Sequence, residues 1–123
     1  MAKRVLIADD EPNIVTSLEF LMEQAGYETR VAANGQEAID LAGSFHPDLV
    51  LLDIMFPMKS GYEVCQRLKN DPATRDIKIV IVSAKGRDVE VAKALELGAD
   101  AFIGKPFSTR ELVAKVKEML GTS

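Results

Sequence analysis

The chain has 123 residues, with 19 acidic and 15 basic side chains and a formal net charge of -4 at pH 7. This length suits a single domain that can bury a core without disulfides or metals. The acidic balance argues against a general nucleic-acid surface, and the one cysteine excludes an internal disulfide. No stretch approaches the roughly 18 apolar residues of a membrane helix. We therefore expect a cytoplasmic domain that contacts neither membrane nor nucleic acid directly.

Five short apolar runs predict β-strands. Most of these runs are rich in branched aliphatic side chains and are bounded by turn residues, as expected of strands buried on both faces of a parallel sheet. The run at residues 27–32 alternates only weakly, which indicates an outer strand. The strands are expected at residues 5–8, 27–32, 49–52, 79–82 and 101–103.

Helical periodicity after each of these strands predicts five amphipathic helices. Pro12 suits the first turn of the first helix, and Ser108 with Glu111 forms a capping-box pattern at the start of the last. The apolar stripes lie within residues 15–25, 38–42, 64–68, 89–95 and 112–120. Strands that alternate with helices predict an α/β fold, a doubly wound five-stranded parallel sheet with helices on both faces.

Polar side chains follow four of the predicted strands at their carboxyl ends. Asp9 and Asp10 follow the first strand, Asp53 the third, Ser83 the fourth and Lys105 the last. Right-handed crossovers place the carboxyl ends of parallel strands along one edge, where open α/β sheets bind their ligands. We therefore expect these side chains to lie together. Taken singly, each has a plainer interpretation, such as a helix cap for Asp10 or a solvated surface lysine for Lys105.

Three carboxylates at this edge would repel one another. A hard divalent cation such as Mg2+ relieves the repulsion, because it prefers oxygen ligands and usually keeps several waters. Asp10 and Asp53 are the candidate direct ligands, and Asp9 would act partly through water. The main-chain carbonyl of Met55 could supply a further oxygen.

A carboxylate beside such a cation can also act as a nucleophile toward a phosphoryl group. Asp53 is the candidate nucleophile, because it ends the central strand. Phosphoryl transfer mainly requires positioning and charge neutralisation, which the Lys105 ammonium would supply. Ser83 could donate a hydrogen bond to a phosphoryl oxygen.

Together these motifs resemble the receiver domain of bacterial response regulators, the phosphoacceptor half of two-component (phosphorelay) signal transduction. The resemblance extends over essentially the whole chain and rests on Asp9-Asp10, Asp53 with Pro57 and Gly61, Ser83-Ala84, and Lys105-Pro106-Phe107. It implies one receiver domain over residues 1–123 with a flavodoxin-like sheet of strand order 2-1-3-4-5.

The resemblance also implies functional roles at this edge of the sheet. Asp53 would accept a phosphoryl group, in a Mg2+-dependent reaction, from a sensor histidine kinase or a phosphotransfer protein. The Asp9-Asp10 pair would form the acidic pocket, and Lys105 and Ser83 would contact the phosphoryl group. The Lys105-Pro106 peptide bond is similar to the family's cis peptide, which would aim the lysine into the pocket.

In the family that the chain resembles, a switch couples the site to a distant surface. Ser83 would move toward the phosphoryl group and Phe102 would turn inward. This movement would alter the surface made by the fourth helix, the last strand and the fifth helix. A downstream protein, an output domain or a second copy of the chain in a phosphorylation-dependent homodimer could bind there. Met55 and Lys85 should shield the phosphorylated aspartate and slow its hydrolysis.

Three other functions are compatible with this fold class. An aspartyl phosphatase usually has a second aspartate two positions after its nucleophile, where this chain has Met55. A flavin or nucleotide binder needs a loop rich in glycine and hydroxyl residues after the first strand, where this chain has an acidic loop. A receiver-like scaffold that binds partners without phosphorylation stays the alternative. We expect a signalling switch that catalyses only its own phosphorylation and dephosphorylation.

Overall fold

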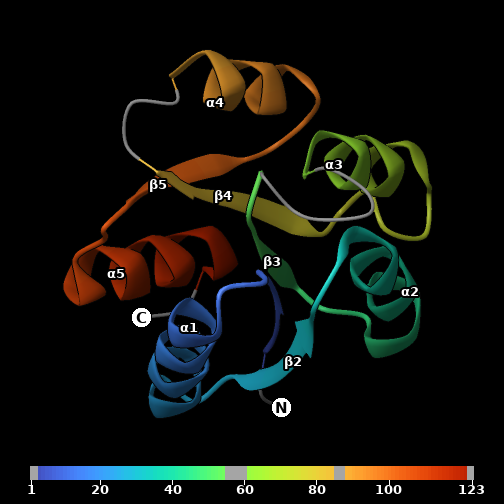
Figure 1. Ribbon diagram of the computed structural model, residues 1–123. Coiled ribbons are helices and arrows are strands. Elements are labelled where there is room, and N and C mark those ends of the chain that lie inside the picture. Colours follow the sequence, from blue (N-terminus) through green and yellow to red (C-terminus); the bar gives the residue numbers. More distant parts are fainter. Residues whose placement is uncertain (1–2, 55–60, 85–87, 122–123) are drawn as a thin grey trace.

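The computed structural model describes residues 3–54, 61–84 and 88–121, over which five parallel strands alternate with five helices (Figure 1). The strands are β1 (Arg4–Ala8), β2 (Glu28–Ala32), β3 (Leu49–Leu52), β4 (Lys78–Ala84) and β5 (Ala101–Lys105). The helices are α1 (Pro12–Gln24), α2 (Gly35–Phe45), α3 (Gly61–Asn70), α4 (Asp88–Glu96) and α5 (Thr109–Leu120). The predicted alternation is confirmed.

The sheet has the hydrogen-bonded order β2-β1-β3-β4-β5, and all four strand pairs are parallel. Helices α1 and α5 lie on one face of the sheet, and α2, α3 and α4 lie on the other (Figure 1). The predicted doubly wound, flavodoxin-like sheet is therefore confirmed. In such a sheet the strand order reverses between β1 and β3, and a crevice opens there at the carboxyl ends.

Two separate cores hold this arrangement together, because side chains along a strand alternate between its faces. In β1, Leu6 and Ala8 belong to the core under α2, α3 and α4, whereas Val5 and Ile7 belong to the core under α1 and α5. Residues 49–52 of β3 divide between the same two cores and are fully buried. Burial on both faces explains why these strands have continuous aliphatic sequences.

Helix α4 differs from the sequence-based expectation. Val91 and Ala94 face the core, whereas Val89, which the predicted stripe includes, is 81% exposed and Leu95 is 42% exposed. Apolar residues occur on both sides of this short helix, so its periodicity alone does not define the buried side. The outer side of α4 therefore presents apolar side chains to the surface.

Gly61, the first residue of α3, packs directly against the end of the β3 segment. Its amide donates to the carbonyl oxygen of Ile54 at 2.9 Å. A Cβ atom there would lie 2.6 Å from the Ile54 Cα and 2.8 Å from the Asp53 carbonyl oxygen. Both are backbone atoms, so a larger residue would push the chain that carries Asp53.

We expect Gly61→Ala to lower the free energy of unfolding by about 1–3 kcal/mol, because the added methyl group overpacks a backbone contact. Urea unfolding followed by circular dichroism would measure the change. Gly43→Ala is the matched control: Gly43 lies within α2, and a Cβ there would meet nothing within 4 Å. The control should be neutral or more stable by a few tenths of a kcal/mol to about 1 kcal/mol. Equal stability of Gly61→Ala and the wild type would contradict the account.

Candidate functional site

The acidic residues predicted to converge lie at the carboxyl ends of β1 and β3, which are neighbours in the sheet. Ala8 and Leu52 form the last residue pair between β1 and β3, and the Asp53 amide donates to the Ala8 carbonyl oxygen at 3.0 Å. Asp9, Asp10 and Asp53 each offer a carboxylate oxygen, and these oxygens all lie within 4.8 Å of one another. Asp9 and Asp53 are buried and Asp10 is exposed, so the cluster opens to solvent on one side.

Lys105, at the end of β5, reaches this cluster from the edge of the sheet. Its Nζ lies 2.9 Å from Asp9 Oδ2, 3.3 Å from Glu11 Oε1 and 3.7 Å from Asp53 Oδ2. Burial by itself would lower the pKa of the ammonium, but the hydrogen bond to Asp9 and the charges of Asp53, Asp9 and Glu11 outweigh burial, so the pKa lies above its ordinary value. Lys105 is therefore cationic at neutral pH.

Asp9 is held by a contact at each of its oxygens. Oδ2 accepts from Lys105, and Oδ1 accepts from the Glu11 amide at 3.0 Å. A set of three close carboxylates suits a hard cation that prefers oxygen ligands and retains several waters. The residues present therefore fit Mg2+.

Ser83 lies near the end of β4, one residue before the pairing of Ala84 with Lys105. The side chain is buried, and its Oγ has no hydrogen-bond partner within the described residues. A buried hydroxyl without a partner costs free energy, and in native proteins such a group calls for an explanation such as strain or a catalytic role. Its position at the edge that carries Lys105 favours a role at this site.

Of the other residues predicted to act at or near the site, some lie within the described residues and some lie outside them. Phe102 on β5 is 37% exposed and lines a cavity of about 350 Å³ between β5 and α5. The peptide bond between Lys105 and Pro106 is cis. Met55, the predicted carbonyl ligand, and Lys85, the predicted shield of the phosphorylated aspartate, lie outside the described residues.

The sequence does not predict the contact between Glu11 and Lys105. Glu11, the N-cap residue of α1, is a third carboxylate within 4 Å of Lys105. Its place directly after the Asp9-Asp10 pair is visible in the sequence, but an acidic residue at the start of a helix is favourable in its own right, because it complements the positive helix terminus. Only the fold shows that its side chain turns toward the lysine.

Comparison with known proteins decides the family. The sequence model of the response regulator receiver domain matches residues 5–117. The chain belongs to this family. Receiver domains are the phosphorylation-dependent signalling domains of two-component systems, and they bind Mg2+ at an acidic pocket. The cluster of Asp9, Asp10 and Asp53 fits such a pocket.

Solved receiver structures share the whole fold with this chain. A putative response regulator from Chloroflexus aurantiacus is 34% identical, with a TM-score of 0.94 and coverage of 98% of this chain and 99% of that one. A CheY-like receiver domain from Methanospirillum hungatei is 31% identical, with a TM-score of 0.91 and coverage of 98% and 95%. The receiver domain of the Pseudomonas aeruginosa sensor histidine kinase PA1611, at 23% identity, TM-score 0.90 and coverage of 99% and 100%, has a magnesium ion in its active site cleft.

In the part of this receiver domain that the structure describes, no helix combines the length and the apolar character needed to cross a bilayer.

The Lys105 contacts predict a pH-dependent contribution to stability. Lys105→Met should lower the free energy of unfolding at pH 7 by about 1–3 kcal/mol, because Asp9 loses its charged partner in a buried position. The pKa of Lys105 is raised by folding, so the contribution is present below the ordinary lysine pKa of 10.5 and is lost as the pH rises through the higher value of the folded state. Urea unfolding from pH 7 to strongly alkaline pH would measure it.

Lys115→Met is the control for this prediction, because Lys115 forms a more exposed ion pair with Glu118 at 3.7 Å. Its loss should cost about 0–0.5 kcal/mol. A Lys105→Met variant that loses no more stability than this control would contradict the proposed strength of the Lys105 contacts.

Proposed function

We propose that Asp53 accepts a phosphoryl group from a sensor histidine kinase or a phosphotransfer protein, and that this event alters the surface made by α4, β5 and α5. The observation that carries the proposal is the Lys105 ammonium, which lies 2.9 Å from Asp9 and 3.7 Å from Asp53 within a cluster of carboxylates. One fixed cation beside a carboxylate at a solvent-open crevice is an arrangement suited to phosphoryl transfer. A downstream protein or an output domain would read the altered surface.

The residues of the acidic cluster would hold Mg2+. Asp10 and Asp53 are the proposed direct ligands, with the main-chain carbonyl of Met55, and Asp9 would contribute through water. When bound, Mg2+ neutralises charge on the phosphoryl oxygens. The same ion would offset the mutual repulsion of Asp9, Asp10 and Asp53, whose oxygens lie within 4.8 Å of one another.

In the proposed reaction, a carboxylate oxygen of Asp53 attacks phosphorus. The new O–P bond forms as the P–N bond of a phosphohistidine breaks, and the electron pair of that bond leaves with the donor imidazole. Lys105 moves its hydrogen bonds to the phosphoryl oxygens, and the buried Ser83 hydroxyl donates another. The unpartnered state of Ser83 Oγ among the described residues supports this role. Hydrolysis later returns Asp53 to a carboxylate.

The proposed output depends on Ser83 and Phe102, which lie on adjacent strands. Residues 80–84 of β4 pair with 101–105 of β5, so a movement of Ser83 toward the phosphoryl group displaces backbone next to β5. Phe102 is 37% exposed, so a turn inward would bury more of its side chain. Such a turn would change the face made by α4, β5 and α5. In α4 itself, Val89 and Leu95 are already exposed.

Met55 and Lys85 are proposed to lengthen the life of the phosphorylated state. Neither side chain offers a carboxamide or carboxylate that could orient an attacking water. A phosphorylation-dependent homodimer is a further partner that the α4-β5-α5 surface would allow. The chain would then act as a switch, and its catalysis would be limited to its own phosphorylation and dephosphorylation.

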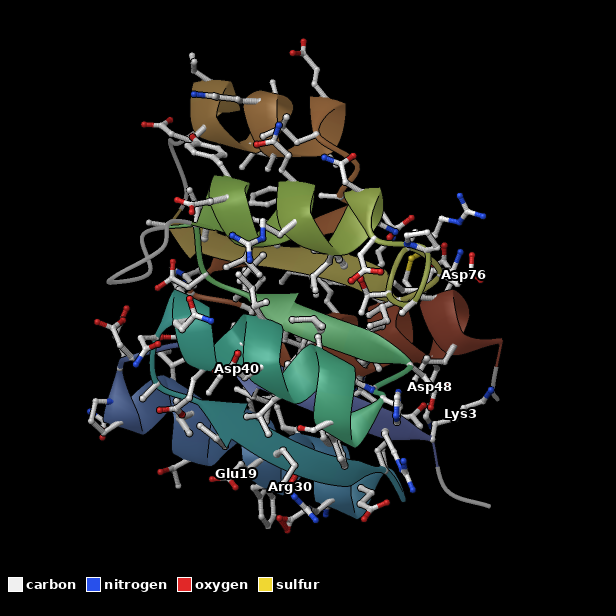
Figure 2. The ribbon with its side chains drawn as sticks, turned by 90° about the vertical axis from the view of Figure 1, so that its right-hand side faces the viewer. Lys3, Glu19, Arg30, Asp40, Asp48 and Asp76 are labelled. Carbon is white, nitrogen blue, oxygen red and sulfur yellow. The ribbon has the colours of Figure 1, made fainter. Side chains whose placement is uncertain are left out.

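Intact mass spectrometry after incubation with phosphoramidate, with and without Mg2+, tests the proposal. We expect a single phosphoryl adduct on the wild type in the presence of Mg2+, and none on Asp53→Asn, because the amide cannot act as the nucleophile. Asp76→Asn is the matched control: Asp76 is an exposed carboxylate in the loop before β4, away from the carboxyl edge (Figure 2). This control should form the adduct as the wild type does.

An adduct that forms equally on Asp53→Asn would contradict Asp53 as the acceptor. The absence of an adduct from the wild type under every condition would favour a scaffold that binds its partners without phosphorylation. Equal yields with Mg2+ and with a chelator would contradict the proposed part of the metal.

A further inference from the structure

Glu11 contacts the lysine of the site but is not part of the three-carboxylate cluster. Its backbone is fixed, because its amide donates to Asp9 Oδ1 and its carbonyl accepts from the Val15 amide at 2.9 Å. Its side chain is 60% exposed, and Oε1 lies 3.3 Å from Lys105 Nζ. The carboxylate therefore stands at the solvent side of the site with its backbone position already determined.

The distances around Lys105 show where the ammonium is held. Asp9 at 2.9 Å and Glu11 at 3.3 Å are within hydrogen-bond reach, whereas Asp53 at 3.7 Å is beyond it. Asp9 and Glu11, in the segment between β1 and α1, thus accept the hydrogen bonds of the lysine, whereas Asp53 is at ion-pair distance. The ammonium has three N–H donors, of which Asp9 and Glu11 engage two, so a phosphoryl group on Asp53 that takes more than one hydrogen bond from Lys105 does so at the expense of this pairing.

The charge of Glu11 also acts on any phosphoryl donor. Asp9, Asp10 and Asp53 already make the crevice acidic, and Glu11 adds a further carboxylate on its exposed side. Phosphoryl donors are anions, so this carboxylate repels them as they approach. Because Glu11 is largely exposed, dissolved salt should screen that repulsion.

We propose that Glu11 is a positioning residue that holds Lys105 in the unphosphorylated protein and competes with the incoming phosphoryl group for it. This inference rests on the proposed function of Asp53. Glu11 thereby slows phosphorylation, and the effect is greater for donors with more negative charge. The site therefore favours donors whose other contacts with the domain offset the repulsion by Glu11, such as a protein that docks on the domain.

Two small donors separate the charge effect from other causes. With acetyl phosphate, the bond from Asp53 oxygen to phosphorus forms as the bond from phosphorus to the acetate oxygen breaks, and acetate leaves with the electron pair. With phosphoramidate, the P–N bond breaks and ammonia leaves with the pair. Phosphoramidate carries less negative charge at neutral pH, because its nitrogen is protonated.

The experiment compares the phosphorylation rate of the wild type with that of Glu11→Gln, which keeps the shape of the side chain and removes its charge. At low salt and fixed Mg2+, we expect Glu11→Gln to react about fivefold faster with acetyl phosphate, the size expected for one exposed ion pair. The gain should be smaller with phosphoramidate. It should shrink toward unity near 1 M salt, where the screening length falls to about 3 Å.

Two further variants distinguish the loss of the Glu11–Lys105 ion pair from the loss of any carboxylate on the protein. Glu11→Asp keeps the charge on a shorter side chain and should retain part of the slowing. Glu23→Gln removes an exposed carboxylate from the last turn of the same helix, far along α1 from Lys105, and should react like the wild type. A merely structural role of Glu11 would change the rates with both donors equally and would not respond to salt.

Equal rates for Glu11→Gln and the wild type with both donors at low salt would overturn the inference while leaving Asp53 as the acceptor. A gain independent of donor charge and of salt would also overturn it, as would an equal gain in Glu23→Gln. A wild type that takes no phosphoryl group from either donor would instead remove the proposed function on which the inference rests.

Discussion

The Lys105 ammonium is the interaction on which the site depends, because it joins the edge strand β5 to the acidic ends of the central strands. Its contacts to Asp9, Glu11 and Asp53 reach across the crevice and place a single positive charge among carboxylates that would otherwise repel one another. The same geometry leaves Lys105 Nζ 3.7 Å from Asp53 Oδ2, an ion-pair distance longer than that of a hydrogen bond. A ligand that arrives at Asp53 therefore meets a cation that is already near and can change partners.

The sheet places this cation and these carboxylates with little freedom. Residues 5–8 and 49–52 are buried on both faces, so the ends of β1 and β3 are fixed by two cores at once. Gly61 packs against the chain just beyond Asp53, which limits movement there as well. Rigid strands with reactive groups at their ends give a site that is preorganised for charge stabilisation.

Much of this arrangement could be predicted from the sequence. The aliphatic runs before Asp9 and Asp53 indicated central strands, and the register of a parallel sheet then placed their ends together. The outward side of α4 could not be predicted, because apolar residues lie on both of its sides and tertiary packing selects Val91 and Ala94. The Glu11 contact could not be predicted either, because it depends on how a lysine 94 positions away crosses the crevice. The predicted roles of Met55 and Lys85 stay predictions.

The most direct test of the central claim is a crystal structure of the protein with Mg2+ and beryllium fluoride, which mimics a phosphoryl group on a carboxylate. We predict the beryllium on an Asp53 oxygen, with Lys105 Nζ and Ser83 Oγ within hydrogen-bond distance of its fluorides and Glu11 no longer paired with the lysine. Phe102 should be less exposed than the 37% found here. Beryllium fluoride on another residue, or on Asp53 with Lys105 and Ser83 unmoved, would contradict it.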